Sequence, residues 1–176
     1  FHQHGPQQQF GNYGLSFICN MSFYSELFTG TTLAFSQEQQ RILTSLLLEG
    51  YQWIIWRGYW DVNALNRQLF RNADIDKGFS LLFAAHSLMK SSEPEVADQI
   101  KKMILRNSSF SQVPNSFTGN KHFRESDYTV HRTPTWLASV RMASERVIGT
   151  ELVNEDNLKG YYMADGALYT YVYGDE

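Results

Sequence analysis

Near its start the chain gathers imidazole, phenol and amide groups within a few positions. His2 and His4 are followed by three glutamines and then by Tyr13, and glycines and a proline interrupt the run at residues 1–14. Polar loops of this kind carry binding and catalytic groups more often than packed elements do. We therefore expect this loop to handle a polar ligand. The alternative is a solvated, amide-rich terminus, because a single histidine or tyrosine has little specificity by itself.

Two arginines four positions apart form a second candidate group. Arg67 and Arg71 would lie on one face of a helical turn, where both guanidinium groups can point at a common anion. The alternative is a pair of solvated arginines on an ordinary surface. The carboxylates Glu151, Glu155 and Asp156 could form a calcium loop, but they lack its regularly spaced oxygen ligands. The histidines show no metal-ligand spacing either, so we expect no metal site.

Composition and charge restrict the class of protein. The 176 residues are 43% hydrophobic and 15% aromatic, which is typical of a globular chain with a core. A net charge of −3 supplies no general field for a polyanion, so we do not expect a nucleic-acid partner. No apolar run reaches the roughly 18 residues that span a bilayer, and we expect no membrane partner. The single cysteine, Cys19, predicts a buried, unreactive thiol.

Helical periodicity dominates residues 1–106. Apolar residues recur at helical spacing in residues 15–27 and again in residues 36–56, where Ser36 and Gln39 form a capping box. Residues 107–116 are rich in serine and asparagine, and helical periodicity does not resume after them. A boundary is therefore expected in this stretch.

Two further helices are expected before that boundary. Asp76 opens one, with Phe79 and Phe83 on its apolar face together with Leu82 and His86. Ser92 and Glu95 form a capping box that opens the other. Its inward-facing residues are expected to be Val96, Ile100, Met103 and Ile104.

Strand patterns follow the boundary. Side chains alternate in character over residues 135–144 and 168–173, and Asp165-Gly166 predicts a hairpin turn before the second strand. Helices followed by strands favour segregated layers or two domains. We therefore predict a helical part at 1–106, a linker at 107–119 and a stranded part at 120–176.

The most specific signal is a set of sequence blocks spread over almost the whole chain, with only residues 75–120 lacking one. The blocks are His4-Gly5-Pro6-Gln7 with Tyr13-Gly14, Arg57-Gly58-Tyr59-Trp60-Asp61-Val62-Asn63, Arg67-Gln68-Leu69-Phe70-Arg71, Val140-Arg141-Met142-Ala143-Ser144, and Glu151-Leu152-Val153-Asn154-Glu155-Asp156-Asn157-Leu158-Lys159-Gly160 with Asp165-Gly166. In their order and nearly in their spacing they resemble the chondroitin AC lyase and hyaluronate lyase family of polysaccharide lyases, to which xanthan lyase is related.

This resemblance implies an α+β multidomain fold. The chain would hold the C-terminal part of an incomplete (α/α) toroid, followed by the first strands of a large antiparallel β-sandwich. Missing parts of the same enzyme are then expected upstream and downstream. We expect the 176 residues alone to be inactive, because the helices are too few to close a toroid and the asparagine that the family uses upstream to grip the carboxylate is absent. We also expect them to associate or to be partly disordered, because an open strand edge with exposed Tyr169, Tyr171 and Tyr173 invites pairing with another chain.

The resemblance also implies a reaction. Uronic-acid polymers are cleaved without water when a base removes the proton on C5 and the oxygen on C4 leaves, while donors neutralise the adjacent carboxylate. Tyr13 is the candidate base and, by the resemblance, the acid that protonates the leaving oxygen. Its phenol has an ordinary pKa of about 10, so a nearby cation is needed, and Arg67 and Arg71 could supply it. His4 matches the family's catalytic histidine.

Other residues receive supporting roles. Glu151 matches the acidic member of the catalytic group, and we assign it to orienting Arg71 or Arg67, because a carboxylate facing an anionic sugar needs a cation. Asn154 and Trp60 are expected to contact substrate. Asn66 stands where the family tends to have glycine, which leaves the local turn uncertain.

The expected protein is thus a secreted or periplasmic bacterial lyase that acts on an anionic polysaccharide, and its chemistry requires no cofactor. Two other hypotheses remain open at this point: a non-catalytic carbohydrate-binding segment, and a structural segment without a ligand. The residues do not distinguish chondroitin, hyaluronan and xanthan, nor internal from terminal cleavage.

Overall fold

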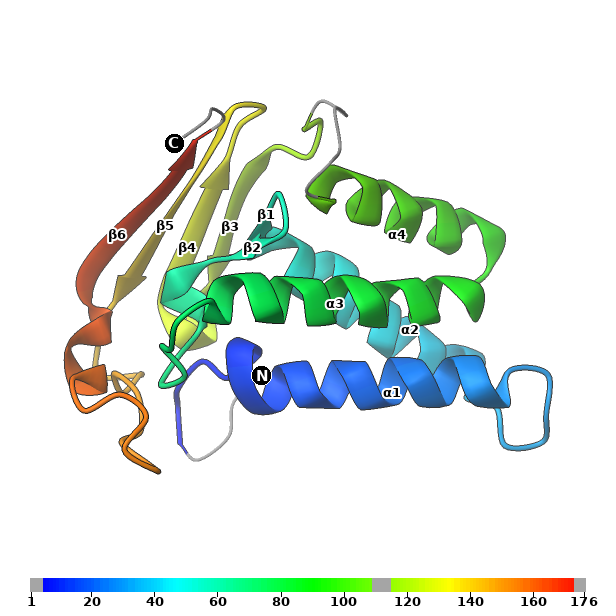
Figure 1. The fold of residues 1–176 in the computed structure, drawn as a ribbon, viewed down its shortest axis with the longest axis horizontal. Helices are drawn as coiled ribbons and strands as arrows, with labels where there is room; N and C mark the ends of the chain where they lie inside the picture. Colours follow the sequence, from blue (N-terminus) through cyan, green and yellow to red (C-terminus); the bar gives the residue numbers. More distant parts are fainter. Residues whose placement is uncertain (1–4, 109–114, 173–176) are drawn as a thin grey trace.

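Helices packed against an antiparallel sheet make up the protein in the computed structural model, which describes residues 5–108 and 115–172 (Figure 1). The helices are α1 (Leu15–Phe28), α2 (Gln37–Ser45), α3 (Ala73–Lys90) and α4 (Pro94–Asn107). The hairpin β1 (Ile55–Trp56) and β2 (Tyr59–Trp60) lies between them and the sheet. The sheet has the order β3 (Gly119–Phe123), β4 (Tyr128–Arg132), β5 (Trp136–Met142), β6 (Asp165–Val172). The expected combination of helices followed by an antiparallel sheet is confirmed.

The helix expected over residues 36–56 begins as predicted but ends early. Ser36 accepts the backbone N–H of Gln39, whose side chain accepts the backbone N–H of Ser36, so the capping box is present. The α-helix stops at Ser45, and a wide turn and a 3₁₀ turn lead into β1. The helical assignment of residues 54–56 is therefore wrong. These residues are buried in the core at the start of a hairpin whose turn places Arg57 and Gly58 at positive φ.

Helix α3 presents a different face to the core from the one expected. Phe79 and Phe83, predicted to face inward, are 73% and 65% exposed. The buried face carries small residues and leucines, because α3 packs closely against α1 and against the β1–β2 hairpin. At Gly78 a Cβ would collide with the carbonyl oxygen of Gly58, so only glycine allows this approach. The helix also begins at Ala73 rather than at Asp76.

Helix α1 confirms the pattern seen in residues 15–27, although Phe23 is exposed. Helix α4 buries Ile100 and Met103 as expected, with Val96 and Ile104 packed beside them. Its predicted capping box is wrong: the helix starts with Pro94 after Glu93, and the side chains of Ser92 and Glu95 do not cap it. The Ser92 hydroxyl donates instead to the carbonyl of Leu88 in the preceding helix.

Two strands of the sheet were not expected from the sequence, namely β3 and β4. Strands β5 and β6 confirm the alternation seen in residues 135–144 and 168–173, with Tyr173 outside the described residues. The predicted hairpin at Asp165-Gly166 is wrong, because a 3₁₀ turn (Gly160–Ala164) precedes β6 rather than a strand. Gly166 does adopt positive φ, and it is the extra residue where the register between β5 and β6 shifts.

A buried carboxylate joins the helical and stranded parts. Asp61, which follows β2, is 1% exposed and accepts hydrogen bonds from Tyr128, Ser139 and Tyr171 on three strands of the sheet. Burial raises the pKa of this carboxyl group, although the three hydroxyl donors oppose the rise. The hydroxyl of Tyr171 also accepts the backbone N–H of Val62 at 2.7 Å, so Tyr171 is an interface residue rather than an exposed one.

Two arginines on the sheet extend this interface. Arg132 donates to the backbone carbonyls of Gln52, Trp53 and Ile55, and burial lowers its pKa to about 9. Arg141 donates to the side-chain oxygen of Asn66 at 3.2 Å, and burial lowers its pKa to about 10. The Arg132 contacts fix the chain that leads into β1, and the Arg141 contact fixes the segment after β2, which leads directly to Arg67.

Candidate functional site

The turn that carries Tyr13 is held tightly by its glycines. It forms a wide helical turn (Phe10–Gly14) directly before α1, and Tyr13 is half-buried. At Gly11 a Cβ would lie 2.7 Å from the carbonyl oxygen of Ala64 and 2.9 Å from the Cα of Leu65, so the two backbones touch there. The backbone beside Tyr13 is thereby fixed against the segment that leads to Arg67.

Arg67 enters the site through a left-handed turn. Asn66 has a φ of +63°, and its side-chain oxygen accepts from Arg141 on β5. Glycine adopts the left-handed backbone conformation most easily, and asparagine is among the other residues that tolerate this conformation best. Asn66 stands where the resembled family tends to have glycine. The turn is nevertheless formed, because Asn66 adopts the positive φ that a glycine would adopt. The Arg67 side chain then turns inward and is 3% exposed.

Arg67 is paired with two carboxylates of the loop that follows β5. Its Nη1 lies 2.8 Å from Glu151 Oε1, and its Nε lies 3.2 Å from Asp156 Oδ2. The Glu151 carboxylate also accepts from the amides of Gln7 and Gln9, at 3.4 Å and 3.2 Å. The expected partnership between an arginine and Glu151 is thus present as an ion pair, and Arg67 is the arginine in it.

Tyr13 lies against the same guanidinium group. The central carbon of the Arg67 guanidinium is 5.7 Å from the centroid of the Tyr13 ring, within the range of a cation–π contact. Three residues from separate parts of the sequence, Tyr13, Arg67 and Glu151, therefore meet at one point.

Arg71 does not share a helical face with Arg67. The residues between them form no helix, and α3 begins only at Ala73. Arg67 is buried, whereas Arg71 is exposed and forms no ion pair with the carboxylates of the described residues. The prediction of one shared face is wrong, because the chain between the two arginines is not helical and the carboxylates of Glu151 and Asp156 hold Arg67 in the interior.

The remaining predicted residues have different outcomes. His4 lies outside the described residues. Asn154 is exposed in the loop between Glu151 and Asp156 and has a φ of +61°. Trp60 is wholly buried, with its ring 5.7 Å from that of Tyr51, so its prediction as a sugar-contacting residue is wrong. It belongs to the core because it lies at the buried position of β2, whose neighbour Tyr59 is exposed.

Two groups in the site were missed by the sequence analysis. Gln7 accepts from the backbone N–H of Glu151 at 3.0 Å and from the Thr150 hydroxyl at 3.2 Å. These bonds hold the loop before α1 against the loop that follows β5. Lys77 on α3 is 8% exposed and donates to the backbone carbonyl of Gly11 and to Gln68 Oε1. Gln7 was visible as part of the amide-rich loop, but Lys77 carried no local signal, since lysines on helices are usually solvated.

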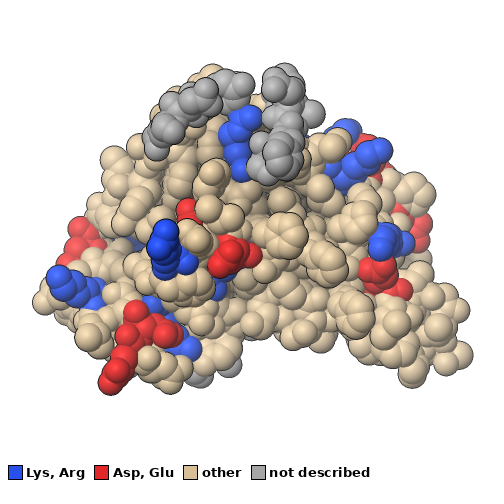
Figure 2. Space-filling view, in the orientation of Figure 1, with Lys and Arg blue, Asp and Glu red and all other residues tan. Residues whose placement is uncertain are grey.

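The charges in this site nearly balance. Arg67 and Lys77 face Glu151 and Asp156. Burial lowers the pKa of Lys77 to about 8, although Asp156 and Asp76 oppose the fall. On the face shown in Figure 2, lysine and arginine side chains are interspersed with acidic ones, so that face has no extended positive surface.

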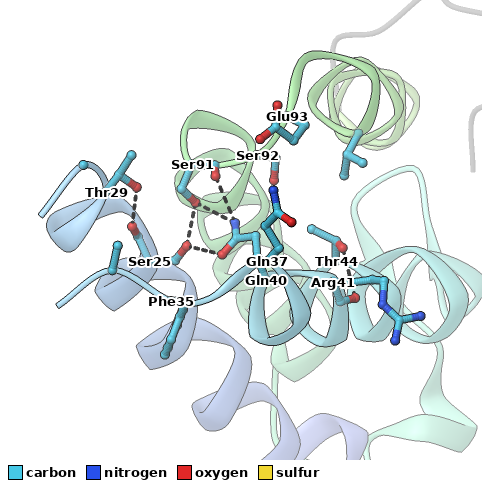
Figure 3. Close-up of a pocket in the computed structure, with 13 residues that line it drawn as sticks. Ser25, Thr29, Phe35, Gln37, Gln40, Arg41, Thr44, Ser91, Ser92 and Glu93 are labelled. Atoms are coloured by element: carbon cyan, nitrogen blue, oxygen red, sulfur yellow. Dashed lines mark hydrogen bonds between the residues drawn. The ribbon is translucent and has the colours of Figure 1, made fainter. Parts of the chain in front are cut away.

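A separate hollow of about 390 Å³ lies near the far end of α1 (Figure 3). Ser25 donates to Gln40, and Gln40 donates to Ser91, so these lining side chains are bonded to one another. No group of three histidine, cysteine, aspartate or glutamate residues within 5–108 and 115–172 is arranged to hold a metal. In the same residues, no helix has the length and apolar character needed to cross a bilayer.

Known proteins match the chain along nearly its whole length. Residues 118–176 match the super-sandwich domain of polysaccharide lyase family 8. Chondroitinase-AC of Pedobacter heparinus is 30% identical over 99% of this chain and 25% of its own length. Hyaluronate lyase of Thermasporomyces composti is 24% identical over 96% of this chain and 26% of its own length. The chain thus spans about a quarter of these relatives.

Solved structures agree with these matches. The structure of a chondroitinase AC lyase studied with bound oligosaccharides aligns with a TM-score of 0.80 and 25% identity, over 98% of this chain and 25% of that one. A Paenibacillus xanthan lyase aligns with a TM-score of 0.88 and 17% identity, over 98% of this chain and 19% of that one, and supports the fold alone. The family match and the two chondroitinase comparisons agree in identifying the chain as a segment of the polysaccharide lyase family 8 kind, with residues 118–176 in the super-sandwich domain of that family.

Proposed function

We propose that this chain forms the catalytic part of a lyase that cleaves uronic-acid-containing polymers, of the chondroitin or hyaluronan kind, by β-elimination. The observation that carries the proposal is that Arg67 contacts both Tyr13 and Glu151 in one partly buried cluster. The names of the relatives, a chondroitinase and a hyaluronate lyase, support the substrate class.

In this proposal Tyr13 takes the C5 proton and then returns a proton to the leaving oxygen on C4. A phenol is a poor base near neutral pH unless a cation stabilises its phenolate. Arg67 is the cation in contact with the ring. Glu151 moves no proton; together with Asp156 it fixes the direction of the guanidinium group.

The uronate carboxylate needs further cations, because the buried site is nearly neutral as it stands. Arg71 is exposed four positions after Arg67 and meets this need without breaking an ion pair among the described residues. We assign Arg71 and His4 to the substrate carboxylate, and Asn154 to the exposed rim of the site. Electrostatic neutralisation of the developing enolate is the term expected to contribute most to catalysis.

The surrounding architecture follows the same proposal. Residues 1–106 would form the C-terminal part of an (α/α) toroid, residues 107–119 would be a linker, and residues 120–176 would form the first strands of a β-sandwich. Such polymers are too large to cross a cell membrane, so we propose a secreted or periplasmic bacterial enzyme.

The test is incubation of the complete protein with chondroitin, hyaluronan and xanthan, with dextran as a control polymer that lacks uronic acid. We expect an unsaturated product that absorbs in the ultraviolet from at least one uronic-acid polymer and none from dextran. Sizing of the products distinguishes internal from terminal cleavage. Retention of a polymer without any unsaturated product would contradict the proposal and favour a carbohydrate-binding segment.

A further inference from the structure

Lys77 connects the two segments that hold the candidate catalytic groups. Its amino group donates to the backbone carbonyl of Gly11, two positions before Tyr13, and to Gln68 Oε1 at 2.6 Å, one position after Arg67. A lysine ammonium has three donors and no acceptor, so one group can serve both oxygens at once.

The two segments touch at a second point. The backbone of Gly11 packs directly on Ala64 and Leu65, with no room for a side chain between them. Both contacts are made by Gly11, but they reach different residues of the second segment, Ala64 and Leu65 by direct packing and Gln68 through Lys77, and this spread limits how that segment can rotate about Gly11. The packing at Gly11 and the bridge through Lys77 together define how the Tyr13 ring faces Arg67.

A cation is well suited to this position. The amino group is buried, which favours loss of its proton, but Asp156 and Asp76 attract the charged form and the Phe70 ring lies 5.7 Å away. Asp156 also pairs with Arg67, so the same carboxylate attracts both Lys77 and the guanidinium beside Tyr13. A hydrogen bond from a charged donor is about twice as strong as a neutral one.

We infer that Lys77 is a positioning residue of this site: it sets the placement of Tyr13 relative to Arg67 by tying the carbonyl of Gly11 to the side chain of Gln68. The inference rests on the proposed function for its effect on turnover. Its structural content, a bridge between two segments, is independent of the reaction.

The experiment compares Lys77→Met with Lys77→Arg and Gln68→Leu in the complete protein. Lys77→Met keeps the length of an unbranched apolar chain and removes the donors. We expect kcat to fall roughly tenfold to 100-fold, the effect of a small misplacement of a reacting group, while KM changes less than about twofold. Gln68→Leu removes one of the two acceptors and should lower kcat less. Lys77→Arg, which keeps the charge and the donors, should retain most of the wild-type kcat.

Hydrogen exchange measured by mass spectrometry supplies a readout that does not depend on activity. Lys77→Met should speed exchange in residues 10–14, while exchange elsewhere in α1 and α3 stays as in the wild type. Lys90→Met is the matched control, because Lys90 lies on the same helix and pairs with Glu26 at the surface. It should leave both kcat and exchange unchanged.

Unchanged kcat in Lys77→Met would overturn the inference. So would equal losses in binding and turnover accompanied by faster exchange throughout the helices, because that pattern reports a loss of stability. If the wild type forms no unsaturated product from any polymer, the proposed function fails and the exchange experiment alone decides: faster exchange confined to residues 10–14 supports the bridge, and unchanged exchange overturns it.

Discussion

Arg67 and Glu151 form a buried ion pair at 2.8 Å across the boundary between the helical and stranded parts of the chain. Arg67 follows a turn that is anchored on the sheet by Arg141, and Glu151 is held by the amides of two glutamines in the first loop. Neither part alone contains the pair. The relative placement of helices and sheet therefore determines whether the guanidinium lies beside Tyr13.

Arg67 and Glu151 are expected to act as one unit in catalysis. Arg67→Met leaves the buried Glu151 carboxylate without its cation, and Glu151→Gln leaves Arg67 with Asp156 alone, whereas the double variant removes both members of the pair. The double variant should therefore lose less activity than the product of the two single losses, with a coupling of about 0.5–3 kcal/mol. A double-mutant cycle on kcat/KM measures this. Strictly additive effects would show that the two residues do not share a network.

Tyr13→Phe should retain binding and lose turnover. The substitution keeps the ring against the Arg67 guanidinium and removes only the oxygen that would carry the proton. General acid–base groups contribute about 10²- to 10⁴-fold, so kcat should fall by that order. Initial rates of unsaturated product and calorimetric binding of an oligosaccharide separate the two effects. Turnover close to that of the wild type would rule out Tyr13 as the base.

Asp61→Ala should destabilise the contact between helices and sheet. Asp61 is buried, and its removal leaves the hydroxyls of Tyr128, Ser139 and Tyr171 without their common acceptor. A buried hydroxyl left without its acceptor costs about 1–3 kcal/mol, and Asp61→Ala leaves three of them. Tyr171→Phe removes one donor to Asp61 and the acceptor of the Val62 N–H, and should cost less, about 1–3 kcal/mol in all. Denaturant unfolding followed by tryptophan fluorescence compares them, and equal stabilities would contradict the role assigned to Asp61.

Asp127 should stabilise the fold in a pH-dependent way. Hydrogen bonds from Ser144 and then from Arg146 hold the pKa of this carboxyl group below its ordinary value. The unfolded chain therefore binds the proton more tightly, and the stabilisation is present above the ordinary pKa of about 3.9 and is lost as pH falls through the folded value. Asp127→Asn should have a lower free energy of unfolding than the wild type at pH 7, and this difference should disappear in acid. Denaturant unfolding at several pH values measures the difference, and a difference independent of pH would contradict this account.

Local patterns predicted the elements whose signal lies within one segment. Helices α1 and α4 follow apolar spacing, and the Ser36 cap needs only neighbouring residues. The face of α3 could not be read this way, because its buried side was selected by the close approach of Gly78 to Gly58, residues on different elements. The same holds for Trp60, whose aromatic character suits a sugar surface as well as a core, and whose burial depends on how β2 packs.

The sequence by itself determined that a helical part precedes a stranded part, and it carried the resemblance that named Tyr13, Arg67 and Glu151, since these depend on residue type and spacing. Only the tertiary structure decided that Arg67 rather than Arg71 holds Glu151, that Asn66 takes a left-handed turn, and that Lys77 bridges two loops. Such contacts join residues far apart in the chain. Their geometry is set by the packing of helices on the sheet, and no local pattern encodes it.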